Sequence, residues 1–163
     1  MNLIQATKDK FVFQLGRREK TLLLEVLKFY PRIPSAHQPL SKSAKLPQPE
    51  SSQRLLDEAL AEQRAENKKQ LRAFLADPQR LAETETGCRL SLSHADLEWL
   101  LQILNDIRVG SWVILGSPEE KLEASLLNET TAPDFWAMEM SGHFQMHLLD
   151  AMEGGTRNAK RGT

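Results

Sequence analysis

The sequence has little cysteine and no long hydrophobic run. Its single cysteine, Cys88, cannot form a disulfide within the chain, which fits a reducing compartment. The longest apolar stretches are too short to span a bilayer. Residues 1–8 also lack the apolar run behind a basic patch that marks a secretory signal. We therefore expect a cytoplasmic protein that does not enter a membrane.

An excess of charge of one sign is lacking as well, because 21 lysine and arginine residues face 22 aspartate and glutamate residues, a net charge of −1. Such a balance gives no overall attraction to nucleic acid or to an anionic membrane. A nucleic-acid-binding module would need its basic side chains gathered on one face. The basic residues that would have to meet there are Arg17, Arg18, Lys20, Lys42, Lys45, Lys68 and Lys69. A weak nucleic-acid-binding module is thus an alternative that the balanced charge argues against.

Two short apolar segments near the start of the chain predict strands. Phe11, Phe13 and Leu15 are separated by single residues, which is the two-residue period of a strand. With residues 3–6 and the polar turn between them, they predict a β-hairpin. An isolated hairpin is only marginally stable in water, so it must pack on other elements. Residues 89–92 alternate weakly and would add a third strand.

Helical periodicity dominates the rest of the sequence. Apolar residues recur at helical spacing in five segments, 16–30, 51–76, 94–115, 118–127 and 133–153. The segment 94–115 has a broad apolar face, a capping box from Ser93 and Asp96, and Gly116 as a stop. We therefore predict a mainly α fold. It is a helical bundle-like domain of about five helices around 94–115, with a small N-terminal antiparallel β-hairpin or three-stranded sheet.

The length of the chain suits a single domain, which we place at residues 1–153. Residues 31–50 contain five of the eight prolines, together with several serines and lysines. This composition cannot build a core, so we expect a loop or a disordered insertion there. Residues 154–163 are polar and follow the predicted end of the last helix, and we expect them to form a disordered tail.

One candidate binding site lies in the predicted central helix, at Asn105, Asp106, Arg108 and Trp112. At helical spacing Arg108 lies on the same side as several leucines, and Trp112 follows four residues later, where it could stack on the guanidinium. A guanidinium on an apolar face must be paired or reach water. One interpretation is an arginine that binds an anion or a carboxylate. The other is a structural ion pair, or a stem that lies over the core and reaches solvent.

A second candidate site lies in the last predicted helix, where Glu139, His143 and His147 follow one another at four-residue steps. Imidazole and carboxylate groups in such a stripe suit a transition metal. However, Phe144 stands where the common zinc signature has a glutamate directly after the first histidine. The alternative interpretation is a polar rim on a buried helix, with no cofactor.

The segment Leu101–Arg108, with the sequence LQILNDIR, resembles a small bacterial family, the domain of unknown function numbered twenty-seventeen. Gly116, Glu119-Glu120, Phe135–Met138 and Glu19 with Leu22 and Leu23 also match that pattern. The resemblance covers the first helix and the last third of the chain, and residues 31–50 have no counterpart in it. It implies a helical core with an Asn-Asp-x-Arg segment and an aromatic final helix. The family has no established activity, but it is discussed beside adaptors of bacterial proteolysis, which implies a regulatory role.

The sequence contains no phosphate-binding glycine loop, no dinucleotide fingerprint and no serine-hydrolase elbow, so we assign no catalytic residue. Function must be argued from a site, and only the two candidates above are available for that. We therefore predict a non-catalytic regulatory or adaptor protein that binds another protein, with homo-oligomers compatible with the sequence. The alternatives are a metal-dependent enzyme that uses Glu139, His143 and His147, and the weak nucleic-acid-binding module.

Overall fold

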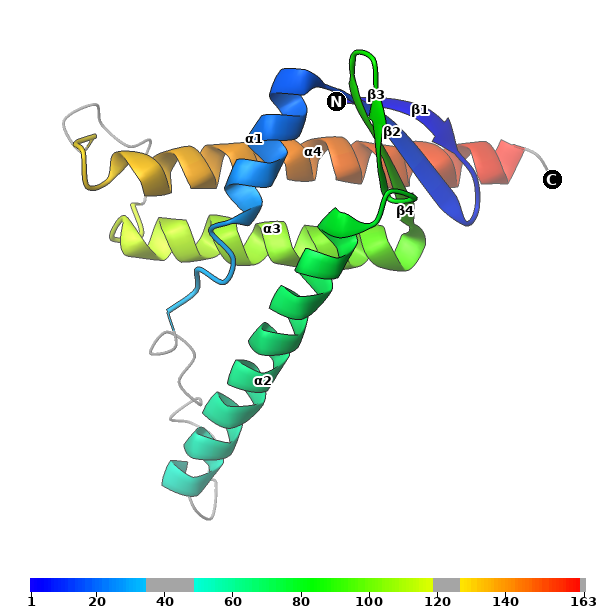
Figure 1. Cartoon of the computed structure of the whole chain (residues 1–163). Helices are drawn as coiled ribbons and strands as arrows, with labels where there is room; N and C mark the ends of the chain where they lie inside the picture. Colours follow the sequence, from blue (N-terminus) through cyan, green and yellow to red (C-terminus); the bar gives the residue numbers. More distant parts are fainter. Residues whose placement is uncertain (35–48, 119–126, 162–163) are drawn as a thin grey trace.

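Figure 1 shows the computed structural model, which describes residues 1–34, 49–118 and 127–161, with side chains as far as residue 154. These residues form four helices and four strands, so the prediction of a mainly α bundle of about five helices is wrong, and the fold is mixed α and β. The predicted helix 118–127 lies almost wholly outside the described residues. The elements are β1 (Asn2–Ala6), β2 (Lys10–Gly16), α1 (Arg17–Leu27), α2 (Pro49–Ala76), β3 (Leu81–Thr84), β4 (Gly87–Ser93), α3 (His94–Ile114) and α4 (Ala132–Arg161).

The strands form one antiparallel sheet in the order β1-β2-β4-β3. The predicted hairpin is confirmed as β1 and β2, and residues 89–92 lie within β4. Phe13 stands opposite Leu90, and Leu15 stands opposite Cys88, so β2 and β4 carry an apolar face together. Strand β3 is not predicted from the sequence, because only Leu81 among its residues is a large apolar one. Pairing with β4, rather than local periodicity, makes this segment a strand.

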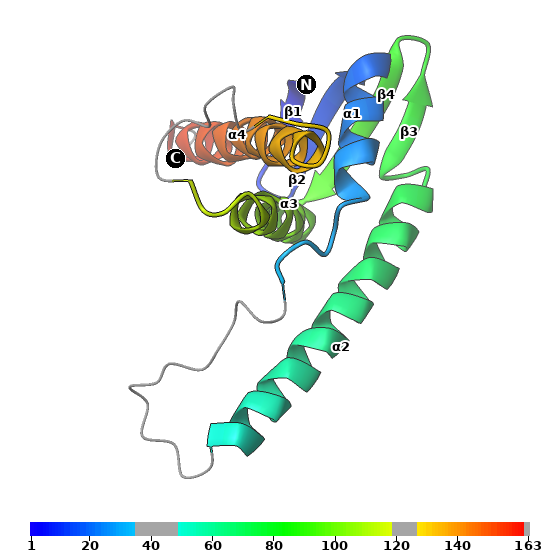
Figure 2. The same cartoon turned by 90° about the vertical axis from the view of Figure 1, so that its left-hand side faces the viewer.

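Helices α3 and α4 run side by side in opposite directions and pack on the apolar face of the sheet with α1 (Figures 1 and 2). Leu97, Leu104 and Ile107 of α3 and Phe144 and Leu148 of α4 are almost completely buried. The predicted capping box is confirmed, since the Ser93 hydroxyl accepts from the Asp96 N–H and the Asp96 carboxylate accepts from the Ser93 N–H. Helix α4 continues past the predicted end at 153 into residues 154–161, because a glycine pair weakens a helix without breaking it.

Helix α2 leaves the body of the molecule, as Figure 2 shows. Leu71 and Phe74 are buried at its C-terminal end, whereas Leu55 near its N-terminus is 63% exposed. This division follows the sequence, because a polar stretch over residues 61–70 separates the apolar ends of the helix. Helix α2 is therefore attached to the body mainly through its last turns.

Residues 30–34, which we call the strap, join the end of α1 to the other helices. The backbone N–H groups of Arg32 and Ile33 donate to Asp106 Oδ1, at 2.6 and 3.3 Å. The Arg32 guanidinium donates two hydrogen bonds of 2.7 Å to the buried carboxylate of Asp134 in α4. From α2, Arg64 donates to the carbonyl oxygen of Ile33 at 2.8 Å. The beginning of the predicted loop 31–50 is therefore tightly bound, and residues 35–48 lie outside the described residues.

We expect Gly110→Ala to lower the free energy of unfolding by about 2–3 kcal/mol, the cost of overpacking at a close backbone approach. A Cβ atom at Gly110 would lie 2.3 Å from the carbonyl carbon of Arg32, so the strap would have to move. The measurement is chemical denaturation followed by circular dichroism.

Gly142→Ala in α4 is the matched control, since its Cβ would make an ordinary contact of 3.7 Å with Arg108 Nε. There the gain in helix propensity should raise the free energy of unfolding by about 0.5–1 kcal/mol. Equal effects of the two substitutions would contradict the close approach of the strap to α3.

Candidate functional site

Two of the four residues of the first candidate site make structural contacts. Asp106 accepts the two strap N–H groups, so its carboxylate is already engaged within the fold. Trp112 does not pack on Arg108. Its indole N–H donates instead to the carbonyl oxygen of Pro118 at 3.2 Å. Asn105 and Arg108 are exposed on the surface of α3. The predicted segment therefore does not act as one unit.

Arg108 instead joins residues of the second candidate site. It lies with Glu139 and His143 around a hollow of about 330 Å³ between α3 and α4, which Met138, Gly142 and Met146 complete. The arginine stem passes close to Gly142, where a Cβ atom would make an ordinary contact of 3.7 Å with Arg108 Nε. This position agrees with the interpretation of a long stem that lies across a helix and reaches water. The guanidinium places a positive charge beside Glu139 and His143.

His147 stands beside this hollow rather than in its wall. Its ring meets the ring of His143 edge to face, with 4.7 Å between centroids. Burial lowers the pKa of His147, and the nearby ammonium of Met1 and His143 lower it further, against the opposing effect of Glu19 and Asp150. Among residues 1–34, 49–118 and 127–154, no three His, Cys, Asp or Glu side chains form a group that could hold a metal ion.

Cys88, the only cysteine of the chain, lies completely buried in β4. Burial raises the pKa of its thiol, so little of the nucleophilic thiolate is present near neutral pH. The side chain therefore packs as a small apolar residue and is no candidate for nucleophilic catalysis.

A groove with a volume of about 410 Å³, which is not predicted from the sequence, lies between α1 and α2. Residues from the end of α1 and from the last turns of α2 line it: Leu24, Leu27, Lys28, Tyr30, Lys68, Leu71, Arg72 and Leu75. The buried stripe of α1 consists of Leu23, Val26 and Leu27, and Leu24 lies outside it. An apolar residue outside that stripe is the one local signal that this helix has a second apolar contact. No local signal could show which segment would lie opposite it.

The walls of the groove combine an apolar floor with a positive rim. Lys28, Lys68 and Arg72 are exposed, and they are the charged residues among those that line it. At the floor, the Tyr30 hydroxyl accepts a hydrogen bond of 3.0 Å from the Asn67 amide. Burial raises the pKa of Tyr30, so its hydroxyl stays neutral near neutral pH. Lys28 forms an ion pair with Glu25 of α1, so the net positive charge of the rim comes from Lys68 and Arg72. The groove therefore offers apolar surface beside positive charge.

Three of the basic residues considered for nucleic acid take part in other features of the described structure. Arg17 donates to the carbonyl oxygen of Glu85 at 2.8 Å, and Lys20 forms an ion pair with Glu83, so both bind the β3–β4 hairpin. Lys68 belongs to the groove. Lys42 and Lys45 lie outside the described residues.

Comparison with protein-family models, with curated proteins and with solved structures finds no match to this chain. The relation to the bacterial family numbered twenty-seventeen therefore stays a prediction. Within the described part of the chain, no helix is both long and apolar enough to span a membrane.

We expect His147 to titrate below its ordinary value of 6.5, because the folded protein disfavours the charged ring. The unfolded chain then binds more protons, so the free energy of unfolding falls as the pH drops below about 6.5. His147→Gln should remove this part of the pH dependence. Nuclear magnetic resonance of the ring protons measures the midpoint, and denaturation at several pH values measures the stability. A midpoint at or above 6.5 would contradict the burial of this ring.

Proposed function

We propose that this protein is a regulatory or adaptor protein that binds an acidic amphipathic helix of a partner protein in the groove between α1 and α2. The observation that carries the proposal is the combination of an apolar floor with a rim whose charged side chains are all positive. The cytoplasm is the compartment proposed for this interaction.

The shape of the groove favours a helix as the bound segment. Leu24 and Leu27 on one side and Leu71 and Leu75 on the other belong to two helices that diverge along the length of α2 (Figure 2). An amphipathic helix buries apolar residues at positions i, i+3 or i+4 and i+7 in such a groove. The backbone N–H and C=O groups of a helix are paired with one another. A helix can therefore lie on an apolar floor without leaving polar groups unpaired.

The charges of the groove favour acidic residues beside the apolar stripe of the partner. Lys68 and Arg72 lie four residues apart on one face of α2, and Lys28, the C-cap residue of α1, also lines the groove. Complementary charges speed the encounter and set the register of the bound helix, while a basic partner would be repelled. The proposed contact therefore weakens as the salt concentration rises.

The alternative of a metal-dependent enzyme gains no support from the hollow at Glu139 and His143. The exposed guanidinium of Arg108 lines the same hollow and would repel a metal cation there. The nucleic-acid-binding alternative loses two of its basic residues to other contacts, since Arg17 and Lys20 bind the hairpin.

A photoreactive amino acid at position 24, in the wall of the groove, tests the proposal in the cells that make the protein. We expect it to cross-link one partner at a segment that mass spectrometry identifies as an acidic amphipathic helix. A synthetic peptide of that segment should then bind the purified protein. Arg72→Glu should weaken that binding about tenfold, which corresponds to about 1.4 kcal/mol.

Arg54→Glu is the matched control, because Arg54 lies on the same helix but far from the groove, with its side chain 79% exposed. It should leave the affinity of the peptide unchanged. Three results would each refute the proposed groove. The first is a cross-link to a basic or uncharged segment, and the second is a yield no higher than from the same photoreactive residue at position 55, outside the groove. The third is an equal effect of Arg72→Glu and Arg54→Glu on the affinity of the peptide.

A further inference from the structure

The face of the sheet that α3 and α4 do not cover is lined by polar side chains. Along the strands, Gln5 stands opposite Val12, and Val12 stands opposite Ser91. One residue pair farther on, Gln14 stands opposite Arg89, while Lys10 stands opposite Ser93 at the other end. Since side chains alternate between the faces of a strand, these residues all share the face opposite Phe11, Phe13 and Leu15.

A pocket of about 520 Å³ lies on this face, and all four strands contribute to it. Its walls consist of Ile4, Gln5, Lys10, Val12, Pro78, Gln79, Ala82, Arg89 and Ser91. Val12 forms the floor and is only 4% exposed, although it points away from the core. The volume lies in the range of about 300–1,000 Å³ that small-molecule sites usually have.

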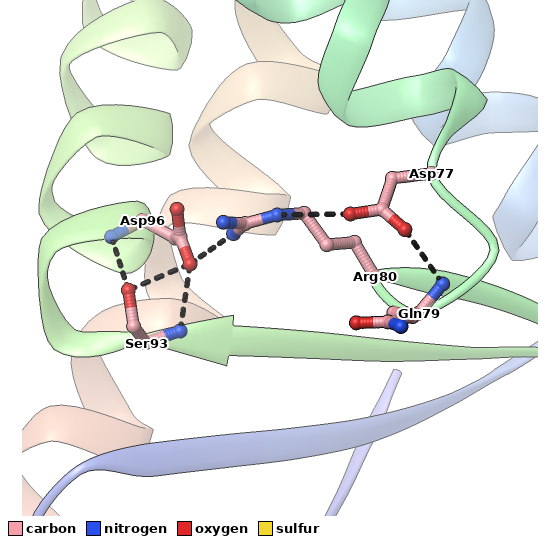
Figure 3. A network of polar contacts seen from close by, with 5 residues as sticks. All are labelled: Asp77, Gln79, Arg80, Ser93 and Asp96. Atoms are coloured by element: carbon pink, nitrogen blue, oxygen red, sulfur yellow. Dashed lines mark hydrogen bonds and ion pairs between the residues drawn. The ribbon is translucent and has the colours of Figure 1, made fainter.

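The turn between α2 and β3 forms one wall of the pocket, and a polar network holds this turn in place (Figure 3). Asp77 accepts a hydrogen bond of 2.8 Å from the Gln79 N–H. Arg80 lies between Asp77 and Asp96 and forms ion pairs with both. Burial acts to raise the pKa of Asp96, but hydrogen bonds from Ser93 and Arg80 outweigh it and lower that pKa. Gln79 is thus held at the pocket by a prearranged turn.

This network also decides the charge that the pocket presents. Asp9, Asp77 and Asp96 line an adjoining hollow that Lys10 also borders, and Arg80 forms ion pairs with both Asp77 and Asp96 and so offsets one of their two charges. In the wall of the pocket itself the charged side chains are Lys10 and Arg89. Both are exposed, and neither forms an ion pair with another described residue. The pocket therefore has a net positive charge.

The spacing of the two cations limits the ligand. Lys10 lies four positions before Gln14, which faces Arg89, so the Cα atoms of Lys10 and Arg89 are roughly 13 Å apart along the strands. Between them, Gln5, Gln79 and Ser91 offer amide and hydroxyl groups. No aromatic side chain lines the pocket, so it offers no surface on which a nucleobase could stack.

We propose that this sheet face binds a small, non-aromatic metabolite with an oxyanion at each end, held by Lys10 at one end and by Arg89 at the other. Guanidinium and ammonium groups bind phosphate and carboxylate alike, and the hydroxyl groups of a polyol would meet Gln5, Gln79 and Ser91. The site is separate from the groove between α1 and α2.

The test is isothermal titration of the full chain with three probes: fructose 1,6-bisphosphate, citrate and inorganic phosphate. We expect one of the first two to bind at a single site more than tenfold more tightly than inorganic phosphate. Lys10→Gln and Arg89→Gln should each weaken that binding about tenfold. Binding of the bisphosphate alone identifies a phosphate ligand, and binding of citrate alone identifies a carboxylate ligand.

Lys8→Gln is the matched control, because Lys8 is an exposed lysine two residues from Lys10 and outside the pocket wall. It should leave the affinity unchanged. Equal weakening by Lys8→Gln would show general charge attraction and overturn the site. Binding of inorganic phosphate as tight as that of either two-ended probe, or no binding of any probe, would overturn it too.

Discussion

The arrangement of the helices depends on the buried carboxylate of Asp134 and its two hydrogen bonds to Arg32. A carboxylate removed from water is costly unless it is paired, and a bidentate guanidinium satisfies both of its oxygens in one geometry. This contact ties the strap to α4, while Asp106 and Gly110 tie it to α3. These contacts fix the path of the strap after the end of α1. Arg64 then binds α2 to the same strap. The angle at which α2 leaves the body follows from these contacts.

The groove and the pocket on the sheet are both consequences of that arrangement. Because α2 meets the body through its C-terminal half, its last turns stand beside α1 and leave apolar residues of both helices facing a common space. The chain then turns at Asp77 and enters the sheet as β3, which brings Gln79 to the uncovered face. One proposed site thus has an apolar floor for a protein segment, and the other has polar walls for a small anion. The helix α2 and its C-terminal turn connect the two.

Several elements could be predicted because their signals are local. The alternation of Phe11, Phe13 and Leu15 identified a strand, and Ser93 with Asp96 identified the start of α3. The four-residue strand β3 could not be predicted, because it depends on hydrogen bonds to β4. That missing strand is one reason why the predicted mainly α bundle is wrong. Of the candidate sites, helical spacing correctly placed Glu139 and His143 on one face. It could not show that Arg108, from another helix, lines the same hollow.

By itself, the sequence determined the periods of its strands and helices, the capping of α3, the polar middle of α2 and the balance of charge. Each of these depends on residues within a few positions of one another, whose geometry the backbone dictates. Only the tertiary structure decided which cations face an apolar groove, which lie unpaired on the sheet, and which are engaged by a carboxylate. Arg32, Arg80 and Arg89 are alike as residues. Arg32 is paired with Asp134, and Arg80 is paired with Asp77 and Asp96, whereas Arg89 has no acid beside it in the pocket wall. Long-range packing, which brings distant segments together, produces these three environments.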